Sequence, residues 1–412
     1  KNDMDMKTKI QLFAAFLLLA VGALWLTSCS SEDAVQGSGN KADATLTLTI
    51  NTGKVGSRAT NWTTDPGSDK ANSENKINRL TVGVFSSDGN TVKTIVELTP
   101  TSESNPSGTY LQGNKANIVT TSLAANDKVL VAVNAPTGKF AGVANVTAFK
   151  AVEEDAKDAL TDGSSEATEI ATNVPMFGES TLTGTGSVFT TTVSVQHQLA
   201  KITLDDLSVA FDANGPYKDA EFTPTEFFLV NVPTTLAFNN DAWVSTAAHL
   251  HGCDVTNTYT SLATSVNSSA WGTYKPYLST GKLTSSALTS SSASFNSKAF
   301  FYAVPNANDA TAAKNMKLII AGTFKTNSSD AGTTVFYPVA LNANYAADGT
   351  PSAATNGGAE VFKVYPNKNY KCTVVIKTKG TTDPTKNLDP QTATVTVTVT
   401  DFVEAKQTTT FE

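Results

Sequence analysis

Two stretches near the ends of the chain alternate strictly between hydrophobic and polar residues. They cover residues 44–52 and 392–400, and both are rich in threonine. The apolar residues of the first are Leu46, Leu48 and Ile50, and those of the second are Val395, Val397 and Val399. A period of two in a run rich in β-branched residues predicts a β-strand at each place. Terminal segments fray unless a sheet holds them, so each strand is expected to have a partner.

Between these stretches, short apolar runs recur at intervals typical of strands. Residues 77–85 and 91–98 flank a turn centred on Asp88 and Gly89, which predicts a β-hairpin. Residues 128–134 are almost continuously apolar, which predicts a buried strand. Further strands are expected at residues 188–204, 227–232, 299–304, 316–324, 335–341 and 363–377.

One helix is expected at residues 148–160, where Phe149, Val152, Ala156 and Leu160 fall on one stripe. The fold class is therefore all-β, with two β-sandwich-like domains in tandem and one or two short helices. Val174–Glu179 interrupts the strand pattern, and a small polar segment follows it. We place the domain boundary near there, which gives an N-terminal β domain at 44–187 and a C-terminal β domain at 188–412.

The first 29 residues have the features of a bacterial lipoprotein signal peptide. Lys7 and Lys9 precede an apolar run that ends in Leu26-Thr27-Ser28-Cys29. This ending resembles a lipobox, in which the cysteine is acylated and becomes the first residue. An ordinary signal peptide or a membrane-spanning anchor is the alternative. Residues 30–43 form a polar tether, and the true start is expected at Met4 or Met6.

Composition narrows the possible functions. The 412 residues carry a net charge of −7, so the chain is not expected to bind nucleic acid. Hydrophobic residues make up 40% and charged residues 16%, which argues against disorder. Beyond Cys29, the chain has Cys253 and Cys372, which form either one disulfide or two buried thiols.

No catalytic motif occurs in the sequence, so we expect no enzyme activity and no cofactor. His249, His251 and Cys253 would share a face of a strand and are zinc ligands by type. Because Gly252 breaks the strand and no fourth ligand is visible, we expect a polar surface loop and no metal. The acidic pairs Glu153-Glu154 and Asp205-Asp206 are expected to be solvated charges.

Residues 51–60 are small and polar and hold Arg58, which makes them a candidate site for a protease. Together with other motifs in their order, this segment resembles the fimbrillins, the structural subunits of type V pili in anaerobic Gram-negative bacteria. The motifs are the lipobox at Cys29, Leu80–Phe85, Val131–Pro136, Val174–Glu179, Leu199–Ile202 and the closing Thr-Val repeat with Asp401-Phe402. Two positions depart from the family pattern, His197-Gln198 where an arginine is expected and Phe402 where tryptophan is more common.

The resemblance implies transthyretin-like domains and assembly by strand exchange. A lipidated outer-membrane precursor is cut between Arg58 and Ala59 by an Arg-specific, trypsin-like protease. The first strand, with Leu46, Leu48 and Ile50, then leaves its groove, and the C-terminal strand of another subunit replaces it. The expected donor strand is residues 392–412, with Val395, Val397, Val399, Phe402 and Val403. The product is an extracellular fimbria of identical and other pilus subunits that supports adhesion or biofilm formation.

Three other interpretations stay open. Both terminal strands could be permanent members of their own sheets, with Arg58 an ordinary surface residue. The chain could be a monomeric outer-membrane lipoprotein that binds a glycan or a host protein, or a tip adhesin of the same family. Tip subunits tend to carry an extra C-terminal domain, whereas this chain ends with its strand free, and Arg58 argues against an anchor subunit. A stalk subunit therefore fits best.

Overall fold

A computed structural model gives the structure of the protein. It describes residues 44–52, 74–101, 108–161, 173–239, 248–260, 262, 272–292, 294–295, 299–306, 314–346, 350–358, 360–386 and 392–401. All of them lie in one compact unit, Ala42–Glu412. Among these residues, no helix has the length and apolar character needed to cross a membrane.

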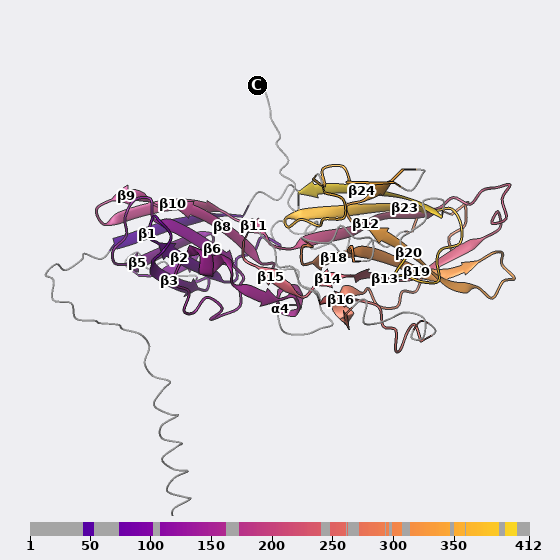
Figure 1. Ribbon diagram of the computed structural model, residues 1–412, viewed down its shortest axis with the longest axis horizontal. Helices are drawn as coiled ribbons and strands as arrows, with labels where there is room; N and C mark the ends of the chain where they lie inside the picture. The colour runs from indigo at the N-terminus through magenta and orange to yellow at the C-terminus, as the bar shows by residue number, and fades with distance from the viewer. Residues whose placement is uncertain are drawn as a thin grey trace, which may run out of the picture. The chain divides into compact units, whose positions relative to one another are not determined.

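The described chain is almost entirely β-structure, which confirms the predicted fold class (Figure 1). Its first sheet has five strands in the order β4-β5-β1-β10-β9. Their bounds are Tyr110–Gln112, Lys115–Thr120, Ala44–Asn51, Val188–Ser194 and Thr183–Thr185. The second sheet also has five strands, in the order β11-β8-β6-β2-β3. Their bounds are Gln196–His197, Met176–Thr181, Lys128–Val133, Leu80–Phe85 and Val92–Leu98.

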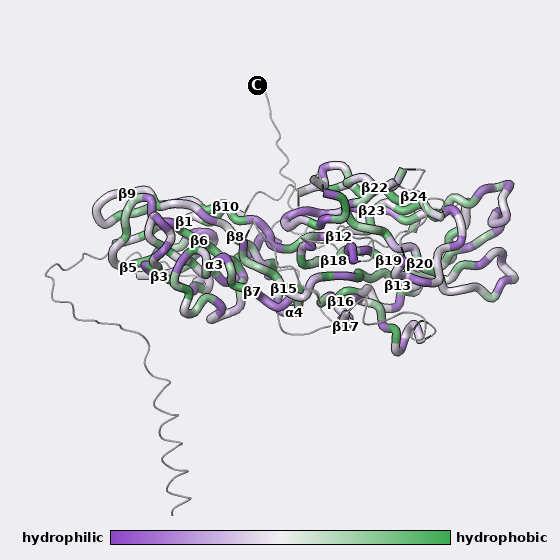
Figure 2. The backbone as a smooth tube through the Cα atoms, in the orientation of Figure 1, coloured by the Kyte–Doolittle hydropathy of each residue, from purple (hydrophilic) through white to green (hydrophobic). Residues whose placement is uncertain are grey.

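These two sheets form a β-sandwich, because one hydrophobic core contains the inward residues of both. From the first sheet it holds Leu46, Leu48, Ile50, Ile118, Phe189 and Val193, and from the second Leu80, Val82, Val84, Val129, Val131 and Val133. Alternate residues along each strand share one face, so the alternating sequence pattern buries this set. In Figure 2 hydrophobic (green) and hydrophilic (purple) positions occur next to one another along the strands.

Two further sheets enclose a second, larger core that contains residues from both. The third sheet has the order β18-β12-β23-β24, with bounds Ala299–Ala303, Ala200–Val209, Lys368–Ile376 and Ala393–Asp401. The fourth sheet has the order β13-β19-β20, with bounds Glu221–Val230, Lys317–Lys325 and Thr333–Ala340. β12 is antiparallel to β18 and parallel to β23. β23 also pairs with β24, so it lies between β12 and β24.

Small elements complete the described chain. One three-stranded sheet joins β14 (Val232–Pro233), β16 (His249–His251) and β17 (Thr273–Tyr274). Two two-stranded sheets join β15 (Thr235–Ala237) with β7 (Glu153–Asp155) and β21 (Asn344–Tyr345) with β22 (Pro351–Ser352). The helical segments are α3 (Val146–Lys150), α4 (Ala156–Thr161) and the short 3-10 turn η2 (Pro276–Leu278).

The single helix expected at 148–160 is wrong in its continuity. α3 ends at Lys150 and α4 begins at Ala156, and β7 lies between them. The reason is a long-range pairing, since β7 forms an antiparallel ladder with β15 in which Glu154 is opposite Leu236. This tertiary pairing overrides the helical period of the sequence.

Two other segments differ from the sequence prediction. Val174–Glu179, expected to interrupt the sheet, instead contributes to β8, which pairs with β6. Gly178 lets β8 lie close to β10 of the first sheet, because a Cβ there would lie 2.4 Å from the Ser194 carbonyl oxygen. The single strand expected at 188–204 is divided into β10, β11 and part of β12, and β10 pairs with β1 in the first sheet. The division into domains at 187/188 stays a prediction.

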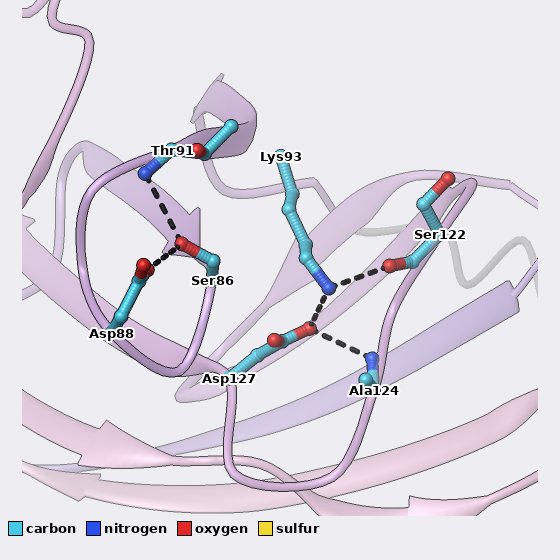
Figure 3. Close-up of polar contacts among 7 residues, drawn as sticks. All are labelled: Ser86, Asp88, Thr91, Lys93, Ser122, Ala124 and Asp127. Carbon is cyan, nitrogen blue, oxygen red and sulfur yellow. Dashed lines mark hydrogen bonds and ion pairs between the residues drawn. The ribbon is translucent and has the colours of Figure 1, made fainter.

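Polar contacts fix the loops at one end of the second sheet (Figure 3). In the turn between β2 and β3, the Ser86 hydroxyl donates to Asp88 and accepts from the Thr91 N–H at 3.1 Å. Nearby, the ammonium of Lys93 forms an ion pair with Asp127 at 2.7 Å. Asp127 also accepts from the Ala124 N–H at 2.7 Å, so one carboxylate joins β3 to the loop before β6.

Candidate functional site

The candidate site begins with β1, which is the middle strand of the first sheet. Leu46, Leu48 and Ile50 are each 0% exposed, while Thr47 on the other face is exposed. One face of the strand therefore supplies part of the sandwich core, as the alternation predicts. Fully burying three such side chains contributes about 5–9 kcal/mol to folding.

Ladders on both sides hold β1. It is antiparallel to β5, with Leu46 opposite Ile118, and parallel to β10, with Leu46 opposite Phe189. At one end of the strand the Ile50 N–H donates to the Asn114 carbonyl at 2.8 Å, and the Asn114 side chain donates back to the Ile50 carbonyl at 3.1 Å. Removal of β1 would thus leave a groove with an open strand edge on each side.

The second candidate element is β24, which pairs with β23 along its whole length (Figure 1). Val397 and Val399 are each 0% exposed in the second core, and Val395 packs against that core while partly buried. Val397 lies opposite Cys372, and Val399 lies opposite Tyr370. The strand expected to serve as the donor is therefore a full member of its own sheet in this structure.

Several predicted site residues lie outside the described residues. They are Cys29, Arg58, Ala59, Phe402 and Val403. Their predicted roles in lipidation, proteolytic processing and strand donation stay predictions. Asn51, the last residue of β1, precedes Arg58 by only seven positions in the sequence.

Glu74, which follows the predicted processing segment in the sequence, lies in a buried ionic cluster. The ammonium of Lys201 on β12 lies 2.8 Å from the carboxylate of Glu74, and both side chains are at most 6% exposed. Tyr302 on β18 donates its hydroxyl to the same carboxylate. His197 contacts the Glu74 carbonyl at 3.1 Å through Nε2, and burial lowers the pKa of its imidazole. The cluster therefore holds the segment that leads into β2 of the first β-sandwich.

The expectation for the acidic pair at 153–154 is wrong for one residue. Glu153 is exposed, but Glu154 is 2% exposed, and no described group donates to its Oε2. Burial, with a smaller contribution from Asp158, raises the pKa of Glu154 to about 8. Asp205 and Asp206 are half-buried.

The histidine segment is not the surface loop that we expected. His249, His251 and Cys253 are all buried, and the Cys253 N–H donates to Nδ1 of His251 at 3.2 Å. Within the described ranges, no three His, Cys, Asp or Glu side chains gather closely enough to hold a metal ion. Cys253 and Cys372 are both buried free thiols, and burial raises the pKa of each. Of the two alternatives for these cysteines, the structure has the unpaired thiols.

Sequence reasoning missed two parts of the site. Neither β4 nor β5 was expected, although β5 forms one wall around β1. Its only signal is the short alternation of Ala116 and Ile118 with polar residues. Asn344, which contacts β24, was also missed. Its partner lies 53 residues later in the chain, and the residues around Asn344 give no sign of that contact.

Part of the chain matches a known protein family. Residues 44–206 match the model of the major fimbrial subunit protein (FimA) family, and this region contains β1 and both strands that flank it. This part of the chain is therefore similar to the FimA fimbrial subunits. No curated protein sequence matches it.

Solved structures show the same fold at low sequence identity. A fimbrilin (FimA) of Porphyromonas gingivalis has a TM-score of 0.57 and 20% identity, covering 88% of this chain and 99% of its own. A protein provisionally described as a cell adhesion protein from Bacteroides eggerthii gives the same TM-score and identity, with 88% and 98% covered. A similarly described protein of Parabacteroides distasonis has a TM-score of 0.55 and 17% identity, covering 88% and 100%.

The match over residues 44–206 and the solved structures together indicate a fimbrilin-like fold.

Proposed function

We propose that this chain is a structural subunit of cell-surface fimbriae that is made as a lipoprotein, processed after Arg58 and polymerised by exchange of terminal strands. The lipid on Cys29 holds the precursor at the outer membrane, and an Arg-specific, trypsin-like protease cuts between Arg58 and Ala59. The released segment includes β1. The C-terminal strand of another subunit, from residues 392–412, then occupies the groove between β5 and β10. The product is the stalk of a fimbria that serves adhesion or biofilm formation.

One observation carries this proposal: the strand just before Arg58 is central in its sheet and completely buried on one face. Its loss removes about 5–9 kcal/mol of apolar burial, while a whole domain is stable by only about 5–15 kcal/mol. The groove therefore requires another strand with apolar side chains at alternate positions. Val395, Val397 and Val399 have that spacing.

Donation by β24 has its own cost. Leaving the second core exposes Val397 and Val399 and the partly buried Val395, at about 1.5–3 kcal/mol for each fully buried side chain. Filling the groove of a neighbour buries the same valines again, so this cost is largely offset. The contact is head-to-tail and does not close on itself, so it produces a filament.

A second candidate function is supported by the same strand. Because β24 is built into its own sheet, both terminal strands could be permanent, and the chain would then act as a monomeric surface lipoprotein that binds a glycan or a host protein. This alternative predicts that cutting at Arg58 leaves the protein monomeric.

Limited trypsin treatment of the chain without its first 30 residues separates the two. We expect a new amino terminus at Ala59 and a ladder of oligomers on an unheated denaturing gel. Arg58→Ala should remain uncut there and monomeric. A chain that ends at Asp401 keeps every described strand and tests whether Phe402 and Val403 are needed for donation. A clean cut at Ala59 that gives only stable monomers would refute strand exchange.

A further inference from the structure

The outer edge of β24, which faces away from β23, is covered by a side chain. Asn344, on the two-residue strand β21, accepts from the Val397 N–H through Oδ1 at 2.7 Å. The same side chain donates from Nδ2 to the Val397 carbonyl at 3.3 Å. One amide thereby satisfies both backbone groups of Val397, as a neighbouring strand would do.

A second contact lies two residues further along the same edge. The Val399 N–H donates to the Thr355 carbonyl at 3.0 Å, within an isolated parallel bridge between Thr355 and Thr398. The N–H groups of Val397 and Val399 therefore both have partners on the side opposite β23. These are also the two residues of β24 whose side chains are fully buried.

The loop that carries these contacts has a rigid base at Asn342. Its side chain is fully buried and donates to the carbonyls of Gly357 and Lys363 at 2.7 and 2.8 Å. Its Oδ1 accepts from the Ala354 N–H at 3.2 Å. The β21–β22 pair then positions Asn344. Asn342 thus holds the loop, and Asn344 holds the strand.

We propose that Asn344, together with the Thr355 carbonyl, is a latch that controls the release of the C-terminal strand for exchange. This inference rests on the proposed function for its biological meaning, but the latch itself is a property of the single subunit. The ladder with β23 and the buried valines hold the strand along its length. The latch adds a local restraint on the edge that the ladder leaves open, and a strand leaving the sheet must break it.

The latch is tested first in the uncut monomer by amide hydrogen exchange, on the chain without its first 30 residues. Asn344→Ala removes both hydrogen bonds to Val397. We expect the Val397 N–H to exchange about tenfold faster or more. Asn344→Asp keeps an acceptor for this N–H but loses the donor to the carbonyl, so a smaller acceleration is expected.

Ser352→Ala is the matched control within the same hairpin. The Ser352 hydroxyl makes one weak bond, to the Asn344 carbonyl at 3.4 Å, so exchange at Val397 should stay within about twofold of the parent chain. Equal exchange in Asn344→Ala and the parent would overturn the latch. If Asn344→Ala loses protection throughout the protein, Asn344→Asp decides in its place.

Assembly after trypsin cleavage is the second readout. We expect Asn344→Ala to form oligomers about tenfold faster than the parent, because its donor strand is released more easily. Faster amide exchange with no oligomers from any variant would refute the proposed strand exchange and leave the latch standing. Oligomers from the parent and from Asn344→Ala at equal rates would refute the latch as a control of assembly and leave the proposed function standing.

Discussion

The contribution of the buried face of β1 to stability can be measured by shortening one of its side chains. Leu48 is 0% exposed and lies in the core between the first two sheets, opposite Ala116 on β5 and Thr191 on β10. Leu48→Ala should lower the free energy of unfolding by about 2–5 kcal/mol, since it removes buried methyl groups and leaves a cavity. Thr47→Ala changes the exposed face of the same strand and should cost less than about 1 kcal/mol.

Urea unfolding of the uncut chain gives the first measurement, with both variants compared at equal denaturant slope. The same variants are then cut at Arg58, and the loss of the strand peptide from the cut protein is followed by mass spectrometry. Leu48→Ala should release the peptide at least about fivefold faster than Thr47→Ala, because it weakens the packing of β1 by at least about 1 kcal/mol more. Equal stability and equal release for the two variants would refute the view that the buried face of β1 holds the groove closed.

Three further predictions concern buried polar groups. Because folding raises the pKa of Glu154 from 4.5 to about 8, its contribution to stability is fully present below pH 4.5 and is lost as pH rises through 8. Glu154→Gln should therefore make stability decline less between pH 4.5 and 8. Thermal unfolding at several pH values measures this, and an unchanged decline would contradict the prediction. Lys201→Met leaves the Glu74 carboxylate without its cation in a buried site and should cost about 3–5 kcal/mol in urea unfolding, whereas the double variant with Glu74→Gln should cost less. Cys253 and Cys372 should react with a thiol reagent only after denaturation, since both are fully buried, and rapid labelling of the folded chain would show that one of them becomes exposed.

The sequence predicts strands best where one face is buried and the other is not. β1 and β24 were found because a half-buried strand must alternate, and β6 because its residues are almost all buried. β5 was missed because only Ala116 and Ile118 mark its alternation, which is too short to stand out. The helix at 148–160 was predicted as continuous because periodicity carries no information about the distant β15 that pairs with part of it.

The same limit applies to the candidate site. The predicted core residues of β1 were correct because hydrophobic burial is a local property of the strand. Glu154 was taken to be solvated because a carboxylate normally is, but the β7 ladder leaves Glu153 and Asp155 exposed and turns Glu154 inward. Asn344 was not predicted, since its role depends on a backbone group 53 residues later in the chain.

The central position of β1 also bears on how a filament would resist tension. A strand that pairs with neighbours on both sides has two rows of hydrogen bonds, and a pull along its axis loads the bonds of both rows together. In the proposed assembly the incoming strand would inherit both rows, one from β5 and one from β10. An edge strand would have only one row and could be peeled away bond by bond. An exchanged strand in the middle of the sheet would therefore make each joint of the proposed filament resist tension by shear of two rows of bonds at once.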